Sequence, residues 1–153
     1  PEDMRLERVS LTALTSDVAQ TVRPEAEAAH VQVQVQAAEP PIDVEADASM
    51  LRQALLNLAV NAVQAMPHGG VLRLATELGR DGRALVRVAD SGTGIPPEQL
   101  ARVFDLYFTT KAGGSGIGLS MVFRTVQLHN GDIDVESAPG RGTTFTIALP
   151  RPA

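Results

Sequence analysis

The spacing of apolar residues in the first third of the chain predicts one helix followed by two strands. From Ser10, a candidate N-cap, apolar residues recur at helical spacing through Val22, and Pro24 is expected to lie near a break or kink. The run VQVQVQ (31–36) alternates like a half-buried strand, with valines inward and glutamines outward. The segment IDVEAD (42–47) is a second strand candidate.

The middle of the chain predicts a long helix and a hairpin. Asp47 can cap a helix over about 48–66, which Pro67 and the following Gly-Gly pair would end. The apolar runs VLRLATEL and ALVRVAD flank GRDG (79–82), the pattern of a β-hairpin.

The last third predicts a loop-rich stretch, a helix and a closing hairpin. Residues 91–115 are loop-rich, with one short helix starting at the Pro96-Pro97 pair. A helix is expected over about 116–129, ending where Asn130 or the next glycine takes the left-handed conformation. The strands GDIDVES and TTFTIALP then close the chain. This order predicts an α/β two-layer sandwich, a mixed and mostly antiparallel sheet covered by helices on one face. The polar residues 1–9 are expected to be linker.

Composition narrows the possible functions. The 153 residues suit one domain, and 44% hydrophobic with 20% charged residues is typical of a soluble globular fold. A net charge of −5 argues against a general nucleic-acid surface. The absence of cysteine excludes disulfides, thiolate nucleophiles and cysteine-ligated zinc. No apolar run reaches membrane-spanning length and no signal peptide opens the chain, so no membrane contact is expected.

Three polar residues share one face of the predicted long helix. Gln53, Asn57 and Asn61 lie at i, i+4 and i+8 in an otherwise apolar segment. Such a stripe is often only a solvated edge. Amide oxygens are also suitable ligands for Mg²⁺ beside nucleotide phosphates, and the stripe alone does not decide between the two.

An acid ends the inward face of the second hairpin strand. The period of two places Val86, Val88 and Asp90 on one face, which opposes the alternative that Asp90 is merely a turn former. A carboxylate turned inward needs donors, from Thr143 or Thr144 or from a ligand such as the exocyclic amine of adenine. A guanine would present a carbonyl there, which the acid would repel.

Glycines follow this acid and also open the last helix. Gly92 and Gly94 would let the backbone turn sharply and approach a flat base closely. In TTKAGGSGIGLSMV (109–122), four glycines precede or begin a helix, and the free N–H groups of a helix start suit a phosphate. The spacing is neither a Walker A loop nor a dinucleotide fingerprint. Lys111, the single lysine, would by default be a surface residue and could instead supply a mobile positive charge.

Together these motifs resemble the GHKL ATPase superfamily, most closely the catalytic and ATP-binding domain of bacterial sensor histidine kinases, which has the Bergerat fold. LRQALLNLAVNAVQAM resembles the N box, DSGTGIP the first glycine box, VFDLYFTTK the F box and GSGIGLSMV the second glycine box. The closing hairpin carries the Gly-Thr-x-Phe signature, and FTTK is similar to the nitrogen-regulatory type. Residues 10–153 would then be the ATP-binding catalytic domain, and 1–9 the linker from an upstream dimerisation and phosphoacceptor domain.

The resemblance implies a role for each matching residue. Asn61 would ligate Mg²⁺, with Asn57 at the phosphates or the metal, and Asp90 would hold the adenine amine, helped by a water shared with Thr143. Lys111 would reach the phosphates, and Asn57 and Lys111 would be the catalytic pair. The full set implied to bind nucleotide is Asn57, Asn61, Asp90, Gly92, Gly94, Ile95, Phe108, Thr109, Thr110, Lys111, Gly114, Gly116, Gly118, Leu119 and Thr143.

Two departures from the family pattern bear on activity. Many such kinases have a basic residue where Gln64 stands, which leaves Lys111 as the only lysine for the phosphates. Gyrase-like and chaperone members have a glutamate base where Asn57 stands, so efficient hydrolysis is not expected here.

The resulting expectation is an enzyme module that binds Mg·ATP and donates the γ-phosphate to a histidine on a separate helical domain, with a response regulator downstream and a cytoplasmic location. His30, His68 and His129 lack the acid and proline context of a phosphoacceptor, so the acceptor is expected outside this chain. The alternatives are an anti-sigma-type serine kinase and a non-catalytic nucleotide-binding module.

Overall fold

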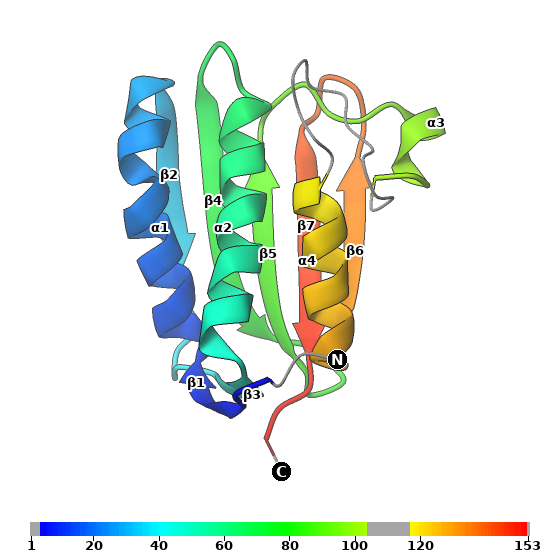
Figure 1. Cartoon of the computed structure of the whole chain (residues 1–153). Coiled ribbons are helices and arrows are strands. Elements are labelled where there is room, and N and C mark those ends of the chain that lie inside the picture. Colours follow the sequence, from blue (N-terminus) through cyan, green and yellow to red (C-terminus); the bar gives the residue numbers. More distant parts are fainter. Residues whose placement is uncertain (1–3, 104–116, 153) are drawn as a thin grey trace.

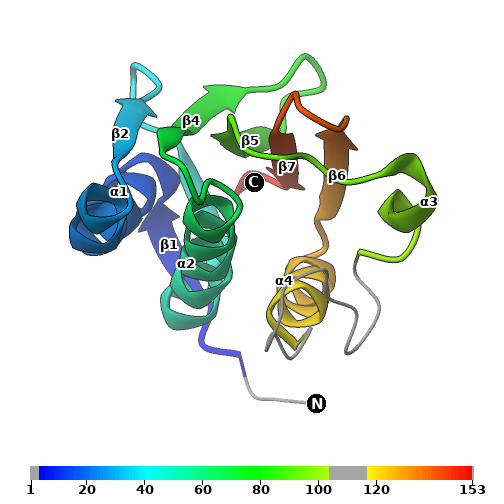
Figure 2. The ribbon, with the colours of Figure 1, turned by 90° about the horizontal axis from the view of Figure 1, so that it is seen from above.

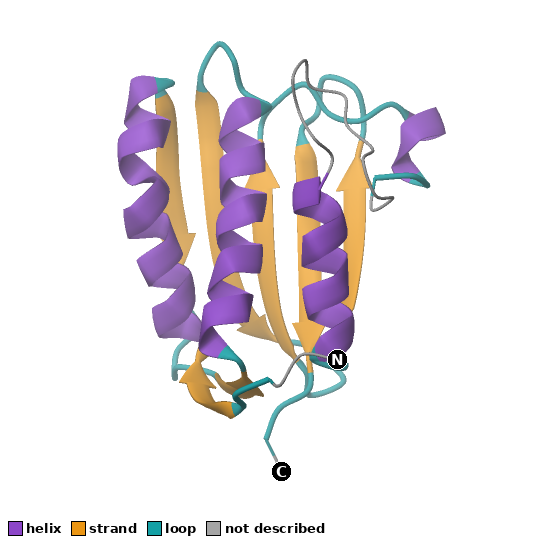
Figure 3. Ribbon diagram, in the orientation of Figure 1, coloured by secondary structure: helices purple, strands orange, loops and turns teal. Residues whose placement is uncertain are grey.

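The computed structural model describes residues 4–103 and 117–152, which form two layers (Figure 1). One layer is a five-stranded sheet in the order β2-β4-β5-β7-β6, where β2 and β4 are parallel and every other pair is antiparallel. The other layer is three long helices on one face of that sheet (Figures 2 and 3). The predicted mixed, mostly antiparallel two-layer sandwich is therefore confirmed.

The elements follow the predicted order closely. The strands of the main sheet are β2 (Val31–Gln36), β4 (Gly70–Leu78), β5 (Ala84–Asp90), β6 (Asp132–Ser137) and β7 (Thr143–Leu149). The helices are α1 (Leu11–Ala28), α2 (Ala48–Gln64), the short α3 (Pro97–Leu100) and α4 (Ile117–Leu128).

The predicted helix boundaries have the expected local causes. Ser10 caps α1 through its Oγ, which accepts from the backbone N–H of Ala13 at 3.0 Å. Asp47 caps α2, since its Oδ1 accepts from the backbone N–H of Met50 at 3.0 Å. After α4, Asn130 takes the left-handed conformation with φ 58°, as predicted for this turn.

The core lies between the helices and the sheet. Because the chain is poor in aromatic residues, this core is mainly aliphatic, with Phe145 as an aromatic member. Leu55 and Leu58 of α2 and Val86 and Ile147 of the sheet belong to the same buried cluster. The long helices are thus held by apolar burial on one face. Within 4–103 and 117–152, no helix is long and apolar enough to cross a membrane.

One prediction was wrong, and a second was wrong in one of its two alternatives. Residues 7–9 are not linker, because β1 (Glu7–Ser10) pairs antiparallel with β3 (Asp43–Ala46) in a separate two-stranded sheet. The alternative that Pro24 breaks the first helix is also wrong, because this helix continues to Ala28, whereas a kink at Pro24 stays a prediction. Pro24 is exposed, so water can satisfy the carbonyl that its missing N–H leaves without a donor.

Candidate functional site

Three elements that carry predicted site residues reach the same end of the molecule. Helix α2 ends there, strand β5 ends there, and α4 begins near it (Figure 1). The loop after β5 is fastened to the end of α2, since the backbone N–H of Thr93 donates to the carbonyl of Ala65 at 3.2 Å. The fold thus brings the C-terminal end of α2, the acid of β5 and the start of α4 to one end of the molecule.

Asp90 is the last residue of β5 and continues its buried face. Val86 and Val88 are 0% and 2% exposed, and the Oδ1 of Asp90 accepts from the backbone N–H of Gly92 at 2.8 Å. Burial raises the pKa of Asp90, while hydrogen bonds from the N–H groups of Gly92 and Thr143 lower it by a smaller amount. The carboxylate is therefore partly desolvated and can accept a further hydrogen bond from a ligand.

The strand register decides which of the two predicted threonines lies beside Asp90. Thr143 is the cross-strand partner of Asp90, whereas Thr144 is the partner of Ala89 and so belongs to the opposite face of the sheet. The prediction that a threonine of the last strand supports Asp90 is confirmed for Thr143, through its backbone N–H. It is wrong for Thr144.

Gly92 and Gly94 allow a close approach, but the groups that approach them in the structure are backbone carbonyls of this chain. A Cβ at Gly92 would collide with the carbonyl oxygen of Ala65 at the end of α2. A Cβ at Gly94 would collide with the carbonyl oxygen of Ala138 in the β6–β7 turn, and Gly94 has φ +79°, which confirms the predicted sharp turn. These glycines hold the loop against two neighbouring segments, and their place beside a base stays a prediction.

Ser137, the last residue of β6, holds the loop that follows β5, a role that the sequence does not predict. Its Oγ accepts from the backbone N–H of Ile95 at 2.7 Å and lies 2.7 Å from the Oγ1 of Thr143. A serine before a Pro-Gly turn is an ordinary turn residue, so the local sequence carries no signal of this contact. Ser137 thus links Ile95 and Thr143, two residues that are predicted to bind the nucleotide.

The polar stripe on α2 forms as predicted. The Nε2 of Gln53 donates to the Oδ1 of Asn57 at 3.0 Å. Asn57 and Asn61 are half-buried, whereas Gln53 is exposed. The two asparagines therefore share one partly exposed face of α2, and Asn61 lies in the last turn of the helix. The oxygens of such amides are suitable ligands for Mg²⁺. In the part of the chain that the structure describes, no group of three or more His, Asp or Glu side chains could hold a metal ion.

The glycine-rich segment is described only from residue 117 onward. Helix α4 begins at Ile117, close to the predicted start at 116. A Cβ at Gly118 would meet no described atom beyond its chain neighbours and the backbone of its own helix, and Leu119 packs against the core. The predicted residues that lie outside the described ones are Phe108, Thr109, Thr110, Lys111, Gly113, Gly114 and Gly116.

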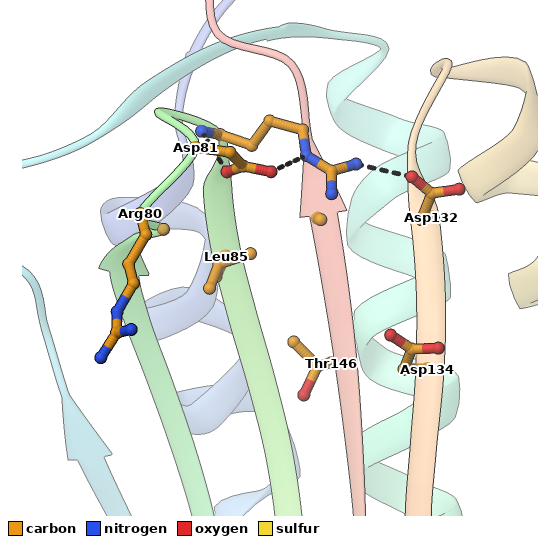
Figure 4. A pocket seen from close by; sticks show the side chains of 9 residues that line it. Arg80, Asp81, Leu85, Asp132, Asp134 and Thr146 are labelled. Carbon is orange, nitrogen blue, oxygen red and sulfur yellow. Dashed lines mark hydrogen bonds and ion pairs between the residues drawn. The ribbon is translucent and has the colours of Figure 1, made fainter.

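A separate surface hollow lies at the other end of β5, by the β4–β5 turn (Figure 4). Arg83 spans it, with hydrogen-bonded ion pairs to Asp81 at 2.8 Å and to Asp132 at 2.6 Å. The backbone N–H and then the side chain of Arg83 lower the pKa of Asp81. None of the predicted site residues lines this hollow, whose charged lining is Arg80, Arg83, Asp81, Asp132 and Asp134.

Comparisons with known proteins identify the family of the chain. The family described as "Histidine kinase-, DNA gyrase B-, and HSP90-like ATPase" matches residues 46–153. The sensor histidine kinase ZraS of Klebsiella oxytoca is 41% identical over 150 residues, covering 98% of this chain and 32% of its own. The histidine-protein kinase AtoS of Escherichia coli is 37% identical, covering 98% of this chain and 25% of its own. The chain thus spans about a third or less of these curated relatives.

Solved structures show the same arrangement. Full-length ShkA in complex with AMPPNP has a TM-score of 0.88 and 31% identity over 97% of this chain and 32% of that chain. The catalytic domain of the histidine kinase ThkA has a TM-score of 0.87 and 28% identity over 97% of both chains. The observed sandwich is therefore the Bergerat fold of histidine kinase catalytic domains.

Proposed function

The chain belongs to the histidine kinase-, DNA gyrase B- and HSP90-like ATPase family, and from this premise we propose that it binds Mg·ATP and donates the γ-phosphate to a histidine on a separate helical domain. The observation that supports this most is Asp90, a partly buried carboxylate in which desolvation outweighs the two backbone donors. An enzyme of this kind is a protein-histidine kinase catalytic domain. Its partners would be the dimerisation and phosphoacceptor domain of a longer kinase and a response regulator, in the cytoplasm, where ATP is available.

Asp90 supports adenine as the base. A carboxylate held in this environment gains most from a ligand that donates a hydrogen bond to it, as the exocyclic amine of adenine does. The carbonyl of guanine at the same position would face the carboxylate without a proton between them. Gly92, Gly94 and Ile95 belong to the loop that follows Asp90, and we assign them to the border of the base.

The phosphates and metal would lie between α2 and the start of α4. Asn61 would ligate Mg²⁺ through its amide oxygen, and Asn57 would contact the phosphates one turn earlier. Mg²⁺, when bound, supplies the charge that neutralises the phosphate oxygens. Gly118, in the first turn of α4, and Lys111, Gly114 and Gly116, which precede it in sequence, would complete the phosphate contacts.

Two features favour transfer to a protein over hydrolysis of ATP. Asn57 accepts a hydrogen bond from Gln53, and an amide cannot remove a proton from water as a carboxylate can. His129 is 5% exposed, and both of its ring nitrogens are within hydrogen-bonding distance of backbone groups, so it cannot accept a phosphate. Thus Asn57 does not activate water, and His129, just after α4, is not available as an acceptor.

The test is incubation with γ-labelled ATP, alone and with the helical phosphoacceptor domain of the parent kinase. We expect slow hydrolysis alone, and labelling of the helical domain as an acid-labile, base-stable phosphohistidine. Asp90→Asn should reduce labelling, whereas Asp134→Asn, the same substitution at an exposed position of β6, should not. Rapid hydrolysis by the chain alone, or a label on serine, would contradict the proposal.

A further inference from the structure

The hydroxyl of Ser137 contacts three groups. It accepts from the backbone N–H of Ile95 at 2.7 Å and donates to the carbonyl of Gly142 at 3.0 Å. It also lies 2.7 Å from the hydroxyl of Thr143. Ile95 follows the first glycine-rich loop, whereas Gly142 precedes β7 and Thr143 begins it, so one side chain fastens both sides of the proposed adenine site.

The directions of these hydrogen bonds follow from the chemistry of the groups. A backbone N–H can only donate and a carbonyl can only accept, whereas a hydroxyl carries one hydrogen and two lone pairs. Ser137 satisfies the carbonyl of Gly142 with its single hydrogen. Either hydroxyl can donate in the 2.7 Å contact between Ser137 and Thr143, and assigning the hydrogen of Ser137 to Gly142 makes Thr143 the donor. Thr143 has no further hydrogen to give, and its remaining lone pairs can only accept.

Thr143 lies beside the acid that is proposed to recognise the base. It is the cross-strand partner of Asp90, so the two side chains are on the same face of the sheet. The side chain of Thr143 is buried, with only 6% exposure, and the carboxylate of Asp90 already accepts from Gly92 at 2.8 Å. Two neighbouring acceptors of this kind match a base edge or a bridging water that donates hydrogen bonds.

We propose that Ser137 is a positioning residue that makes Thr143 an acceptor and thereby sets the preference of the site for a purine with an amine over one with a carbonyl. The inference rests on the proposed ATP site. Without Ser137, the hydroxyl of Thr143 could turn and donate, directly or through water, to a carbonyl-bearing base. Ser137 would then control base selectivity without touching the nucleotide.

The experiment compares binding of ATP and inosine triphosphate, which has a carbonyl in place of the amine, by isothermal titration calorimetry. Ser137→Ala should lower the ratio of ATP to inosine triphosphate affinity about three- to tenfold, the range for one hydrogen bond. Ser137→Thr keeps the hydroxyl and should keep the wild-type ratio. A role confined to stability would weaken both nucleotides equally and leave the ratio unchanged, which would overturn the proposal.

A second variant tests the same idea while the loop anchor stays intact. Thr143→Val leaves the contacts of Ser137 with Ile95 and Gly142 and should also lower the ratio. Ser137→Ala in this background should lower it no further, because Ser137 acts through Thr143; an additional loss would contradict that. If the wild type does not bind ATP, the proposed function itself fails, whereas a selective wild type with unchanged variants overturns only the role of Ser137.

Discussion

The Nε2 of His129, just after α4, accepts a hydrogen bond from the backbone N–H of Asp47, which caps α2, at 3.1 Å. Its Nδ1 is 2.7 Å from the carbonyl of Thr125, so the ring hydrogen lies on Nδ1 and both nitrogens are used. The carboxylate of Asp47 accepts from Met50 and, through Oδ2, from the backbone N–H of Arg5 at 3.0 Å. One residue pair therefore joins the end of α4, the start of α2 and the incoming chain.

His129→Ala should consequently destabilise the fold. It would leave the N–H of Asp47 without its acceptor and remove a side chain that is 5% exposed. An unsatisfied buried N–H costs about 1–3 kcal/mol, so the free energy of unfolding in urea should fall by at least that range. His68→Ala, at an exposed turn position, is the control and should change it by less than about 0.5 kcal/mol. Equal effects of the two variants would refute a structural role for the His129–Asp47 contact.

A pair of glycine substitutions separates backbone strain from close packing. Gly94 and Gly140 have nearly the same conformation, with φ +79° and +76°, but only Gly94 faces a backbone carbonyl, that of Ala138. Gly140→Ala should cost about 1–2 kcal/mol of unfolding free energy, the cost of a left-handed alanine. Gly94→Ala should cost more, because the loop must also move away from the β6–β7 turn. Thermal or urea unfolding of both variants measures the difference, and similar losses would show that the close approach is unimportant.

Much of this architecture could be predicted from the chain because the long elements bury one face. The alternation of valines predicts that Asp90 lies on the inner face of β5, and the structure confirms that placement. Strand β1 was missed because its four residues, ERVS, have no clear period and pair with a distant segment. The roles of Gly92 and Ser137 also depend on segments that are far apart in sequence. Local patterns cannot report such contacts.

The metal ligand on α2 can be tested with a matched residue of the same stripe. Asn61→Ala should remove the amide oxygen that is proposed to ligate Mg²⁺. The gain in ATP affinity that Mg²⁺ provides should then fall about tenfold, if one ligand contributes as much as a hydrogen bond to a charged group. Gln53→Ala, two turns earlier and exposed, is the control and should keep most of that gain. Calorimetry with ATP, with and without Mg²⁺, gives the comparison. A gain unchanged in Asn61→Ala would show that this residue is not a ligand.

The ionised carboxylate of Asp90 should lower the free energy of unfolding, although it supports the binding of ATP. Burial raises its pKa, which means that the folded state binds a proton more readily than the unfolded state. Above both pKa values the buried charge costs stability. As the pH falls from the raised value toward the ordinary one, about 3.9, this cost is relieved, and below it the effect is constant.

Asp90→Asn lacks this titration, so the stability of the wild type relative to the variant should rise as the pH falls through that window, measured by urea unfolding at several pH values. At neutral pH, where Asp90 is ionised, the same variant should bind ATP more weakly by about 1–3 kcal/mol, because the charged acceptor for the adenine amine is lost. Asp134→Asn, at an exposed position of β6, should show neither effect. A relative stability that falls with decreasing pH would contradict desolvation of Asp90, and an unchanged ATP affinity would remove this residue from the adenine site.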